Sequence, residues 1–500
     1  MGVNKLEYQR RPEPPGLPVR LGPRPVALAG REELLADLDG RLAGDGAQPG
    51  PRVAVLYGLG GAGKTSVAVE YAHRHVAEVG VCWQFAAGDP TVLGAQFTEL
   101  AAQLGARELV DNRDPVASVH GVLARAQTEW LLVFDNVTDR ASVQPFVPPA
   151  GRGRVLITTQ NQHWPPGLAL DVPVLDVEVA AGFLVSRTGD ADRGSARELA
   201  GALGGLPLAL EQAAAYMQAS GTSLGRYLPL FRARQADLLA RGEVAGHPLD
   251  VAATLGLGLS RLAGEAPSAV AMLRLLAFLA PEPAPLLALL DDGQATDPAV
   301  AATVGPLLGD LVAAGDAVAA LRRYSLVTLP GDGLVLVHRL AQAVTRAQLN
   351  DDQASLWRQA SATLTEAAVP ADPQLPASWP ACALLLPHAR SVLSLTSSGI
   401  WIIARALGYS GSYPAARDLS QQIAAAHEGD VNCGPEHPDT LTARADLAHW
   451  TGQAGDAAGA RDQFAALLPV RERVLGPAHP STLSTRADLT YWSGKARDAG

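Results

Sequence analysis

The chain has 500 residues, 48% of them hydrophobic, and a formal net charge of −10 at pH 7. Because single domains usually hold about 100–200 residues, this length predicts several domains with sizeable cores. The negative charge argues against a nucleic-acid partner or an anionic membrane surface, and no run of about 18 uncharged apolar residues predicts a membrane span. The three cysteines, Cys82, Cys382 and Cys433, form no CxxC motif and predict free thiols. Since no apolar leader segment follows Met1, we expect a cytoplasmic protein.

The first segment, residues 1–25, holds six prolines without hydrophobic periodicity, so it is predicted to be a disordered tail. Further along, a β-type apolar run, Val53–Tyr57, leads into Gly58-Leu-Gly-Gly-Ala-Gly-Lys64-Thr65 and then into a helical pattern. This strand–loop–helix order is typical of a P-loop, whose backbone amides and helix amino terminus hold phosphate oxygens. A glycine-rich turn between two buried elements is the alternative. The predicted nucleotide-binding residues of the loop are Gly58, Gly60, Gly61, Ala62, Gly63, Lys64, Thr65 and Ser66.

Lysine usage supports the P-loop interpretation. Of the 40 basic residues only three are lysines, Lys5, Lys64 and Lys495, and this arginine-rich usage is typical of a high-GC bacterial genome. The chain nevertheless has a lysine inside the loop, where a compact ammonium group fits and a planar guanidinium does not. We expect Lys64 to contact the β- and γ-phosphate oxygens during catalysis and the Thr65 hydroxyl to ligate Mg²⁺.

From Arg52 to about Val174 strands alternate with helices, which predicts a parallel α/β sheet. The predicted strands are Val53–Tyr57, Val81–Phe85, Trp130–Phe134 and Arg154–Thr158. Asp135 follows the third strand, where a P-loop ATPase places the second acid that holds Mg²⁺ for catalysis. Asn136 comes next and cannot accept a proton, so we expect slow hydrolysis. Thr158 and Thr159 end the fourth strand and are candidates for sensing the γ-phosphate; ordinary strand ends are the alternative at both places.

The remainder of the chain is predicted to be mostly helical. An alanine-rich helical run covers about 177–239, and a further run over about 249–349 ends in a hairpin pattern with strands Ser325–Leu329 and Leu334–His338. Helices followed by a hairpin are typical of a winged-helix domain. The predicted domains are a P-loop NTPase domain (26–174), a helical domain (175–245), a winged-helix domain (246–348), a helical spacer (349–399) and an α-solenoid of repeats (400–500).

The carboxyl-terminal part contains an internal repeat. Gly434–Leu447 recurs as Gly476–Leu489, an offset of 42 residues (476 − 434), and Trp450 recurs as Trp492. Each unit fits two antiparallel helices. Because such arrays normally end in a polar capping element, and the last copy stops after one helix, we expect the array to continue. Two repeat histidines lack partners at metal-ligand spacing and are interpreted as surface or helix-cap residues: His437 and His479.

Taken in order, the motifs resemble the NB-ARC group of STAND ATPases, and the repeats resemble tetratricopeptide repeats of the kinesin-light-chain type. The motifs that carry the resemblance are Gly30-Arg31-Glu32, Gly58…Thr65, Asp135, Thr158-Thr159, Gly205-Leu206-Pro207 and Val337-His338-Arg339-Leu340. The resemblance implies binding of ATP or ADP with Mg²⁺. It implies that Gly30 and Arg31 lie beside adenine and ribose, and that Pro207 packs on adenine. It also implies that His338 bonds the β-phosphate of ADP and holds the winged-helix domain closed.

Two positions depart from the family pattern. Members usually have an arginine where Gln160 follows the two threonines, and that arginine senses the γ-phosphate. Since glutamine is neutral, we expect either weakened recognition of ATP or the use of another arginine, such as Arg152 or Arg154. Plant members have Met-His-Asp where this chain has Val337-His338-Arg339, a version found in bacterial members that bear repeats.

The resemblance implies a signalling switch in which ADP holds a closed form, and a protein or peptide bound to the repeats allows exchange for ATP. Nucleotide-dependent homo-oligomerisation is compatible with such a switch. Three other functions stay open: a rapid ATPase, a DNA-binding transcription regulator that uses the winged helix, and a repeat scaffold with a structural nucleotide site. Residues 250–346 hold six arginines and nine acids, which does not favour DNA binding.

Overall fold

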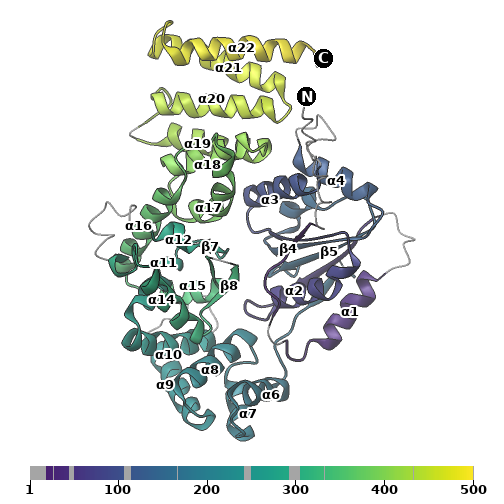
Figure 1. The fold of residues 1–500 in the computed structure, drawn as a ribbon, viewed down its shortest axis with the longest axis vertical. Helices are drawn as coiled ribbons and strands as arrows, with labels where there is room; N and C mark the ends of the chain where they lie inside the picture. The colour runs from purple at the N-terminus through teal and green to yellow at the C-terminus, as the bar shows by residue number, and fades with distance from the viewer. Residues whose placement is uncertain are drawn as a thin grey trace, which may run out of the picture.

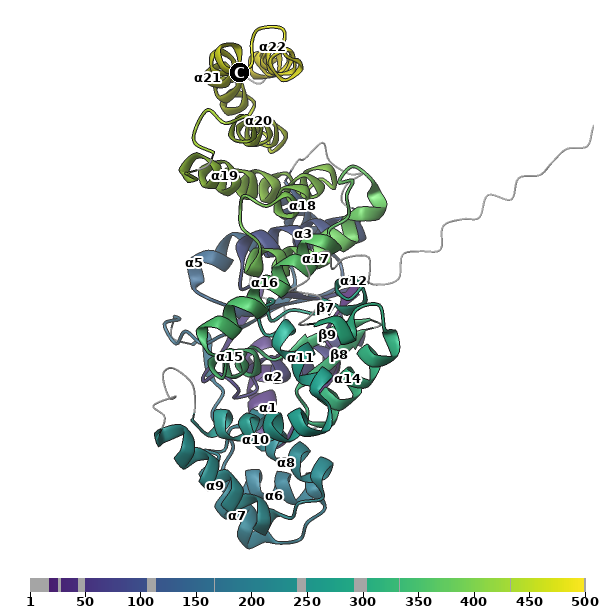
Figure 2. The same cartoon turned by 90° about the vertical axis from the view of Figure 1, so that its left-hand side faces the viewer.

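The structure, a computed structural model, describes residues 18–25, 28–43, 50–105, 114–165, 167–240, 249–291, 304–331, 333–431 and 433–498. Figure 1 shows four parts in space: an α/β domain with its sheet, a group of helices at the lower end, a mixed part beside the sheet, and stacked helices at the upper end. Seen after a quarter turn, the last stacked helices extend beyond the other parts (Figure 2). The mixed part, residues 249–347, thus lies next to the α/β domain.

Six parallel strands form the sheet of the α/β domain in the order β1-β3-β4-β5-β2-β6. Their bounds are Val19–Arg20 (β1), Arg52–Tyr57 (β2), Val81–Ala86 (β3), Trp130–Val137 (β4), Gly153–Thr159 (β5) and Ala169–Asp171 (β6). The four predicted strands are confirmed, since β2, β3, β4 and β5 contain them. In this order β5 lies between β2, which precedes the P-loop, and β4, which carries Asp135. The carboxyl ends of the three strands meet at one edge, where open α/β sheets bind ligands.

Alternate side chains of the strands fill two cores, one on each face of the sheet. In β4, Leu131 and Val133 join the core that contains α1 and α2, whereas Leu132 and Phe134 join the core that contains α3 and α4. These helices are Glu32–Leu42 (α1), Lys64–His75 (α2), Pro90–Gln103 (α3) and Pro115–Arg125 (α4). Because both faces are covered, the strands have continuous apolar runs in the sequence.

The structure differs from the predicted tail at residues 18–25. Val19–Arg20 form β1, which pairs in parallel with Cys82 and Trp83 of β3 at the edge of the sheet. The Arg20 guanidinium lies 5.6 Å from the centre of the Trp83 ring and forms an ion pair with Glu99 of α3. Two paired residues are too few to produce a period-2 pattern, which explains why the sequence did not indicate this strand. The rest of the predicted tail, residues 1–17, lies outside the described residues.

Two further parts follow the sheet in the chain. The first is helical, with Val177–Thr188 (α6), Arg193–Ala202 (α7), Pro207–Ser220 (α8) and Leu224–Ala240 (α9). The second contains Leu249–Glu265 (α10), Pro267–Leu276 (α11), Ala284–Pro285 (β7), Leu286–Leu289 (α12), Leu311–Arg323 (α14), Val327–Gly331 (β8), Leu334–Val337 (β9) and Arg339–Ala347 (α15). Its antiparallel sheet has the order β7-β9-β8. The predicted hairpin of a winged-helix fold is confirmed as β8–β9, whereas the short strand β7 was not predicted.

The carboxyl-terminal helices stack through a contact that recurs with the repeat. After α16 (Asp351–Ala368) and α17 (Trp379–Val392), the stacked helices are Ser398–Tyr409 (α18), Tyr413–Gly429 (α19), Pro438–Gln453 (α20), Ala457–Val474 (α21) and Pro480–Asp498 (α22). The Trp450 ring packs on Gly408 and the Trp492 ring packs on Gly452. A Cβ on these glycines would come within 2.4 and 2.5 Å of the rings, so a larger residue does not fit. A tryptophan of one unit thus packs on a glycine of the preceding unit, as the predicted repeat requires.

The two repeat histidines cap helices, as predicted. His437 Nδ1 accepts a hydrogen bond from the Asp439 amide at 3.3 Å at the start of α20. His479 Nδ1 accepts one from the Ser481 amide at 3.2 Å at the start of α22. Equivalent histidines therefore serve the same local purpose in the two units: each satisfies a backbone amide that has no partner within its helix.

Two expectations from composition concern the chain as a whole. All three cysteines are free in the structure, as predicted. In the part of the chain that is described, no helix combines the length and apolar character needed to cross a bilayer.

Replacing Gly452 by alanine should weaken the stacking of the repeats. The added methyl group would overlap the Trp492 ring, and overpacking of this kind costs about 1–3 kcal/mol of stability. Thermal unfolding followed by circular dichroism should show a lower midpoint or a separate early transition.

The control is Gly494→Ala at the equivalent place in the next unit. A Cβ at Gly494 meets no atom within 4 Å, and alanine favours a helix over glycine, so its midpoint should stay equal or rise. An unchanged midpoint for Gly452→Ala would contradict the packing role of the glycine.

Candidate nucleotide-binding site

The predicted P-loop connects β2 to α2 at the carboxyl edge of the sheet. Gly58, Gly61 and Gly63 have φ angles of 143°, 83° and 93°, which glycine adopts without the strain that a side chain would cause. Space also excludes a side chain at Gly58, where a Cβ would lie 2.7 Å from the Val172 carbonyl oxygen. No side chain caps the first turn of α2, so its backbone N–H groups are available to an anion.

Lys64 lies inside this loop. Its side chain is only 6% exposed, and Nζ donates to the carbonyl oxygens of Gly58 at 2.9 Å and Leu59 at 2.8 Å. Burial and the positive charge of Arg339 lower the pKa of Lys64 to about 8, although Asp135 acts in the opposite direction. An anionic phosphate would be a stronger partner for the ammonium group than these neutral carbonyls.

The two residues predicted to ligate Mg²⁺ contact each other. Thr65 Oγ1 donates to Asp135 Oδ1 at 2.8 Å, and Thr158 Oγ1 donates to the same oxygen at 2.5 Å. Three elements, α2, β4 and β5, therefore converge on one carboxylate oxygen. The described residues contain no group of three or more His, Cys, Asp or Glu side chains that could hold a metal ion by themselves. One carboxylate and one hydroxyl suit Mg²⁺, which proteins usually bind together with substrate phosphates and water.

Thr159 lies differently from the prediction. Its hydroxyl donates to the Val137 carbonyl oxygen at 2.7 Å and accepts from the Asn161 amide at 3.0 Å, and its side chain is buried. Successive residues of a strand point to opposite faces, so Thr158 faces Asp135 and Thr159 does not. The structure therefore places Thr158 at the site, and Thr159 holds the end of β5.

Gly30 and Arg31 connect the loop to neighbouring segments. Gly30 has a φ of 61°, and a Cβ there would lie 2.7 Å from Val179 of α6. The buried Arg31 guanidinium donates to the carbonyl oxygens of Ala62 at 3.0 Å and Pro173 at 2.7 Å. Both residues thus lie next to the phosphate loop, where Arg31 fixes its backbone. Their contact with adenine and ribose stays a prediction.

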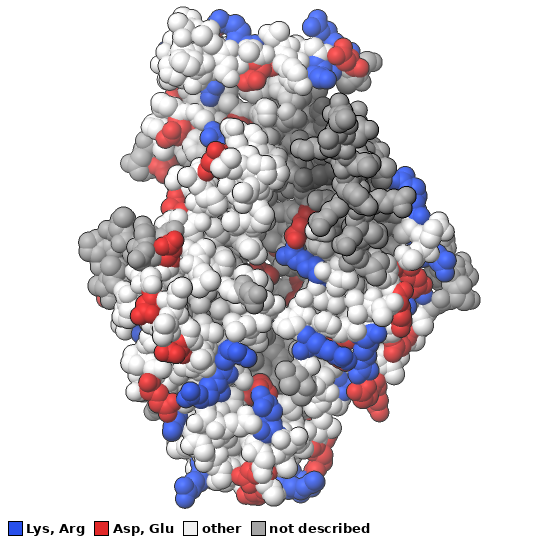
Figure 3. All heavy atoms as spheres, in the orientation of Figure 1, with Lys and Arg blue, Asp and Glu red and all other residues white. Residues whose placement is uncertain are grey.

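Two later parts of the chain contact the same loop. Helix α8 begins at Pro207, the proline of the Gly-Leu-Pro motif, in the first helical position where a missing N–H has no cost. The Leu208 amide donates to the Gly61 carbonyl oxygen at 3.4 Å. A Cβ on Gly61 would lie 3.4 Å from Leu208 and 3.6 Å from Leu340 of α15. Gly61 is therefore enclosed between the helical domain and the winged-helix domain, and Figure 3 shows a hollowed surface where these parts meet the α/β domain.

His338 occupies the turn between β9 and α15. Its Nδ1 accepts a hydrogen bond from the Leu340 amide at 3.2 Å, which caps α15. The side chain is exposed, yet the surrounding protein and the charges of Arg339 and Lys64 lower its pKa to about 4. Such a combination is expected of a side chain that lines a cleft near cations. The imidazole is therefore neutral at neutral pH.

Arg339 was not predicted as a site residue, but it reaches the carboxyl edge of the sheet. Its guanidinium donates to the side-chain oxygen of Asn136, after β4. The Gln160 amide, in the orientation that satisfies both groups, accepts from Arg339 Nη1 at 3.2 Å and Nη2 at 2.5 Å. Asn136 has a φ of 64° and donates its backbone N–H to Thr158 at 2.8 Å. Its left-handed backbone, which asparagine tolerates, turns the amide toward Arg339.

The arginines suggested as substitutes for the family arginine lie elsewhere. Arg154 stands near the start of β5, where it pairs with Glu129 at 3.0 Å and with Glu78 at 3.3 Å. Arg152 precedes β5, also at the amino end of the strand. Because a strand of this length separates the two edges of the sheet, neither arginine can reach the P-loop. This part of the prediction was wrong: the sequence pattern showed proximity along the chain but not the direction of the strand.

A second acid also belongs to the electrostatics of the site. Glu282 lies between α11 and β7, and burial together with the charge of Asp135 raises its pKa to about 8, while Arg20 has the opposite influence. The winged-helix domain thus brings both a cation and a carboxyl group toward Asp135. No sequence motif indicated this acid, because it is distant from the sheet along the chain.

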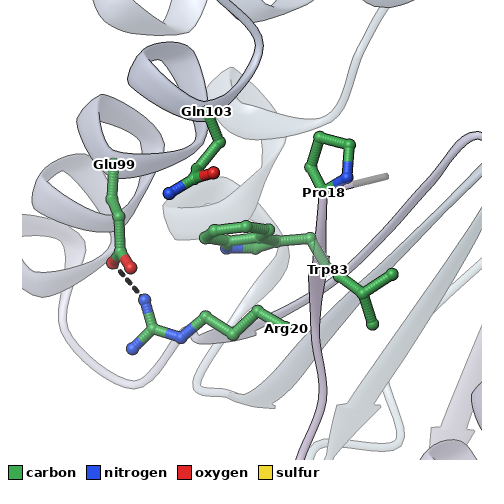
Figure 4. A pocket seen from close by; sticks show the side chains of 6 residues that line it. Pro18, Arg20, Trp83, Glu99 and Gln103 are labelled. Carbon is green, nitrogen blue, oxygen red and sulfur yellow. Dashed lines mark hydrogen bonds and ion pairs between the residues drawn. The ribbon is translucent and has the colours of Figure 1, made fainter. Parts of the chain in front are cut away.

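A separate pocket lies at the β1 edge of the sheet and is not part of this site. It has a volume of about 400 Å³ and is lined by Pro18, Val19, Arg20, Trp83, Glu99 and Gln103. Figure 4 shows Arg20 crossing below the Trp83 ring toward Glu99. Three strands, β3, β4 and β5, separate β1 from β2, which leads into the P-loop.

The chain has the fold of a P-loop ATPase of the STAND class with a tetratricopeptide repeat array. It is similar to the crystal structure of a STAND (signal transduction ATPase with numerous domains) protein with a tetratricopeptide repeat sensor from Pyrococcus horikoshii. The TM-score is 0.54 at 14% sequence identity, and the match covers 96% of this chain and 67% of that chain. Residues 440–481 match the family model of the tetratricopeptide repeat. The resemblance derived from the motifs is therefore confirmed at the level of the fold.

Sequence comparison adds regulatory proteins. The chain is 30% identical over 228 residues to the regulatory protein AfsR of Streptomyces coelicolor, covering 42% of this chain and 22% of that protein. It is 29% identical over 343 residues to AfsR of Streptomyces griseus, covering 65% and 33%. A nucleotide-binding leucine-rich repeat (NLR)-like protein of Hyaloscypha variabilis is 26% identical over 210 residues, covering 36% and 21%. The chain thus spans between about a fifth and a third of the length of these relatives.

We expect His338 to remain neutral well below its ordinary pKa of 6.5 in the nucleotide-free protein. Because folding lowers this pKa to about 4, the neutral imidazole contributes stability above pH 6.5 that is lost as the pH falls toward 4. NMR titration of labelled histidine, with the resonance assigned by its loss in His338→Gln, should give a midpoint near 4.

Addition of Mg·ADP should raise this midpoint, since a nearby phosphate favours the imidazolium. A midpoint near 6.5 before addition would contradict the described environment of the imidazole.

Proposed function

We propose that this protein is a nucleotide-operated signalling switch that binds ADP and ATP with Mg²⁺ and hydrolyses ATP slowly. The observation that carries the proposal is the packing of two later domains on Gly61 of the phosphate loop. A nucleotide bound there would lie against three domains at once, so its identity would change the free energy of holding them together. Different affinities of a closed and an open form for ADP and ATP then make the bound nucleotide a switch.

The donors and acceptors at the loop suit a di- or triphosphate. Lys64 and the uncapped first turn of α2 offer positive charge and N–H groups, and Thr65 and Asp135 offer oxygen ligands for Mg²⁺. When bound, Mg²⁺ would neutralise phosphate oxygens and polarise the terminal phosphate. We assign the β-phosphate to His338, whose imidazole lies near Lys64. For the base and sugar we propose the family positions Gly30, Arg31 and Pro207.

Slow hydrolysis follows from the residues at the strand ends. Asn136 stands directly after Asp135, and its side-chain oxygen accepts a hydrogen bond from Arg339. An amide cannot take a proton from water, and this amide is already engaged. Gln160, the other polar residue on this edge, is neutral too. Asn136 near the end of β4 and Gln160 after β5 therefore offer no general base to a water nucleophile.

Contacts with α3 support the proposed control by the repeats. The Arg390 Nε of α17 forms an ion pair with Asp89 Oδ2 at 2.5 Å, and its Nη1 donates to Gln422 of α19 at 3.2 Å. Asp89 caps the start of α3 in the NTPase domain. Farther along α3, a Cβ on Gly94 would lie 3.7 Å from Ala415 of α19. We infer that a protein or peptide bound to the repeats changes nucleotide exchange by moving these helices relative to α3.

The alternative of a DNA-binding regulator receives less support. In a winged-helix domain DNA is read by a helix that bears basic side chains. The first residues of α14, the helix before the hairpin, are Leu311 and Val312, with exposed fractions of 67% and 74%. These apolar side chains do not neutralise phosphates. A salt-dependent DNA shift with the full chain would favour this alternative.

A structural nucleotide site in a repeat scaffold is the other alternative. In that case the exchange of nucleotide would have no effect on partner binding or on assembly. Nucleotide-dependent homo-oligomerisation, which we also propose, would argue for the switch. Sedimentation of the protein in Mg·ADP and in Mg·ATP compares the two functions directly.

Protein purified without added nucleotide should release ADP, near one equivalent, on denaturation. Lys64→Ala should carry little nucleotide, because the loop loses its cation and the loss of a charge-assisted bond weakens affinity by about tenfold or more. Chromatography of the released nucleotide gives the measurement, and Lys495→Ala, an exposed lysine of α22, is the control. Wild-type protein that carries no nucleotide and takes up neither Mg·ADP nor Mg·ATP would exclude the switch.

Arg390→Ala should speed nucleotide exchange. The variant removes a half-buried ion pair between α17 and α3, and a pair of this kind contributes roughly 1 kcal/mol, so we expect release of a fluorescent ADP analogue to be about fivefold faster. We choose Arg390 for the change because Asp89 also caps α3.

Arg417→Ala is the matched control, since Arg417 is an exposed arginine of α19 whose ion-pair partner is its neighbour Asp418. Equal release rates for Arg390→Ala and the unchanged protein would remove α17 from the control path.

A further inference from the structure

We propose that Arg339 of the winged-helix domain is the residue that distinguishes ATP from ADP by binding the γ-phosphate. The inference rests on the proposed nucleotide switch. It assigns to α15 the function that the family gives to an arginine at the place of Gln160. It also makes recognition of the terminal phosphate an interaction between two domains.

The position of Arg339 is the first argument. Its guanidinium contacts Asn136 after β4 and Gln160 after β5. β5 lies between β4 and β2, and β2 carries the P-loop. The Gln160 amide itself adjoins the loop, since a Cβ on Gly60 would lie 3.7 Å from Gln160 Nε2. The Gln160 side chain thus lies between the Arg339 guanidinium and the phosphate loop.

The charge balance is the second argument. Arg339 takes part in none of the ion pairs formed by the described residues, and its two partners, Asn136 and Gln160, are neutral amides. Its charge is near enough to Lys64 and His338 to disfavour their protonated forms. The partly buried Arg154, by contrast, has a carboxylate partner in Glu129. The two cations Arg339 and Lys64 therefore lie near each other, with Asp135 as a nearby counter-charge.

Competition between partners links this recognition to the switch. A guanidinium binds a phosphate by paired, charge-assisted hydrogen bonds, which are stronger than bonds to neutral amides. A γ-phosphate would therefore draw Arg339 away from Asn136 and Gln160. ADP offers no such group, so with ADP the bridge from α15 to the ends of β4 and β5 remains. The terminal phosphate thereby alters the contact that joins the winged-helix domain to the sheet.

The test compares affinities of the full chain for Mg·ADP and for Mg²⁺ with a non-hydrolysable ATP analogue. In EDTA-treated protein, displacement of a fluorescent ADP analogue measures both. Arg339→Ala should weaken binding of the ATP analogue by about 10- to 100-fold, the range for a bond to a charged group, and that of ADP by less than about threefold. Arg339→Lys should fall in between, because it keeps the charge but loses the fork.

A rescue variant separates recognition from folding. In Arg339→Ala combined with Gln160→Arg, the charge returns from the neighbouring strand end, so affinity for the ATP analogue should recover. Arg323→Ala, an exposed arginine at the end of α14, is the control and should bind both nucleotides as the unchanged protein does. Melting curves of each variant report on folding.

The outcomes differ for the two proposals. Wild-type protein that binds neither nucleotide would overturn the switch itself. Wild-type protein that binds both, with an Arg339→Ala variant that binds both equally well or loses both equally, would overturn the assignment of Arg339 and leave the switch standing. If Arg339→Ala fails to fold, the Arg339→Lys variant decides. Its ratio of affinity for the ATP analogue to affinity for ADP must be lower than that of the unchanged protein for the assignment to hold.

Discussion

Contact at one glycine of the phosphate loop constrains the arrangement of three domains. Gly61 has a φ of 83°, and Leu208 of α8 and Leu340 of α15 lie 3.4 Å and 3.6 Å from the place where its Cβ would be. Since both leucines are at helix starts, the helical and the winged-helix domain each approach the loop with the amino-terminal end of a helix. Any ligand held by the loop therefore lies within the junction of the three domains, and any change in that ligand acts on all of them.

The charges around the junction explain why a ligand would matter to it. Lys64 and Arg339 bring two cations together, and Asp135 offers one nearby carboxylate, shared with the hydroxyls of Thr65 and Thr158. Burial lowers the pKa values of Lys64 and His338, and the positive charge of Arg339 lowers both further. In the function that we propose, a phosphate chain with Mg²⁺ would offset the repulsion between these cations, so the junction and the ligand would stabilise each other.

The repeat array contacts the NTPase domain at α3. Arg390 connects α17 to the cap of α3, and the tryptophan–glycine contacts connect each repeat to the one before it. The outer helices α20–α22 connect to the NTPase domain through α19 and α17, which contact α3. In the switch that we propose, these few contacts would join the surface that binds the partner to the site that binds the nucleotide.

The sequence alone determined the local elements of the fold. The contacts between side chains of distant segments could not be predicted from it. The P-loop, the strand that carries Asp135 and the repeat are local patterns, in which residue types at fixed spacing dictate backbone geometry, and the structure contains each of them. Whether Thr158 or Thr159 faces Asp135 depended on the alternation of side chains along β5. That Arg339, and not Arg152 or Arg154, reaches the carboxyl edge of the sheet depended on the direction of β5 and on a contact between residues 203 positions apart. Local pattern sets which elements form; which side chains meet is decided by the packing of distant segments, because that packing depends on the shapes of all the parts together.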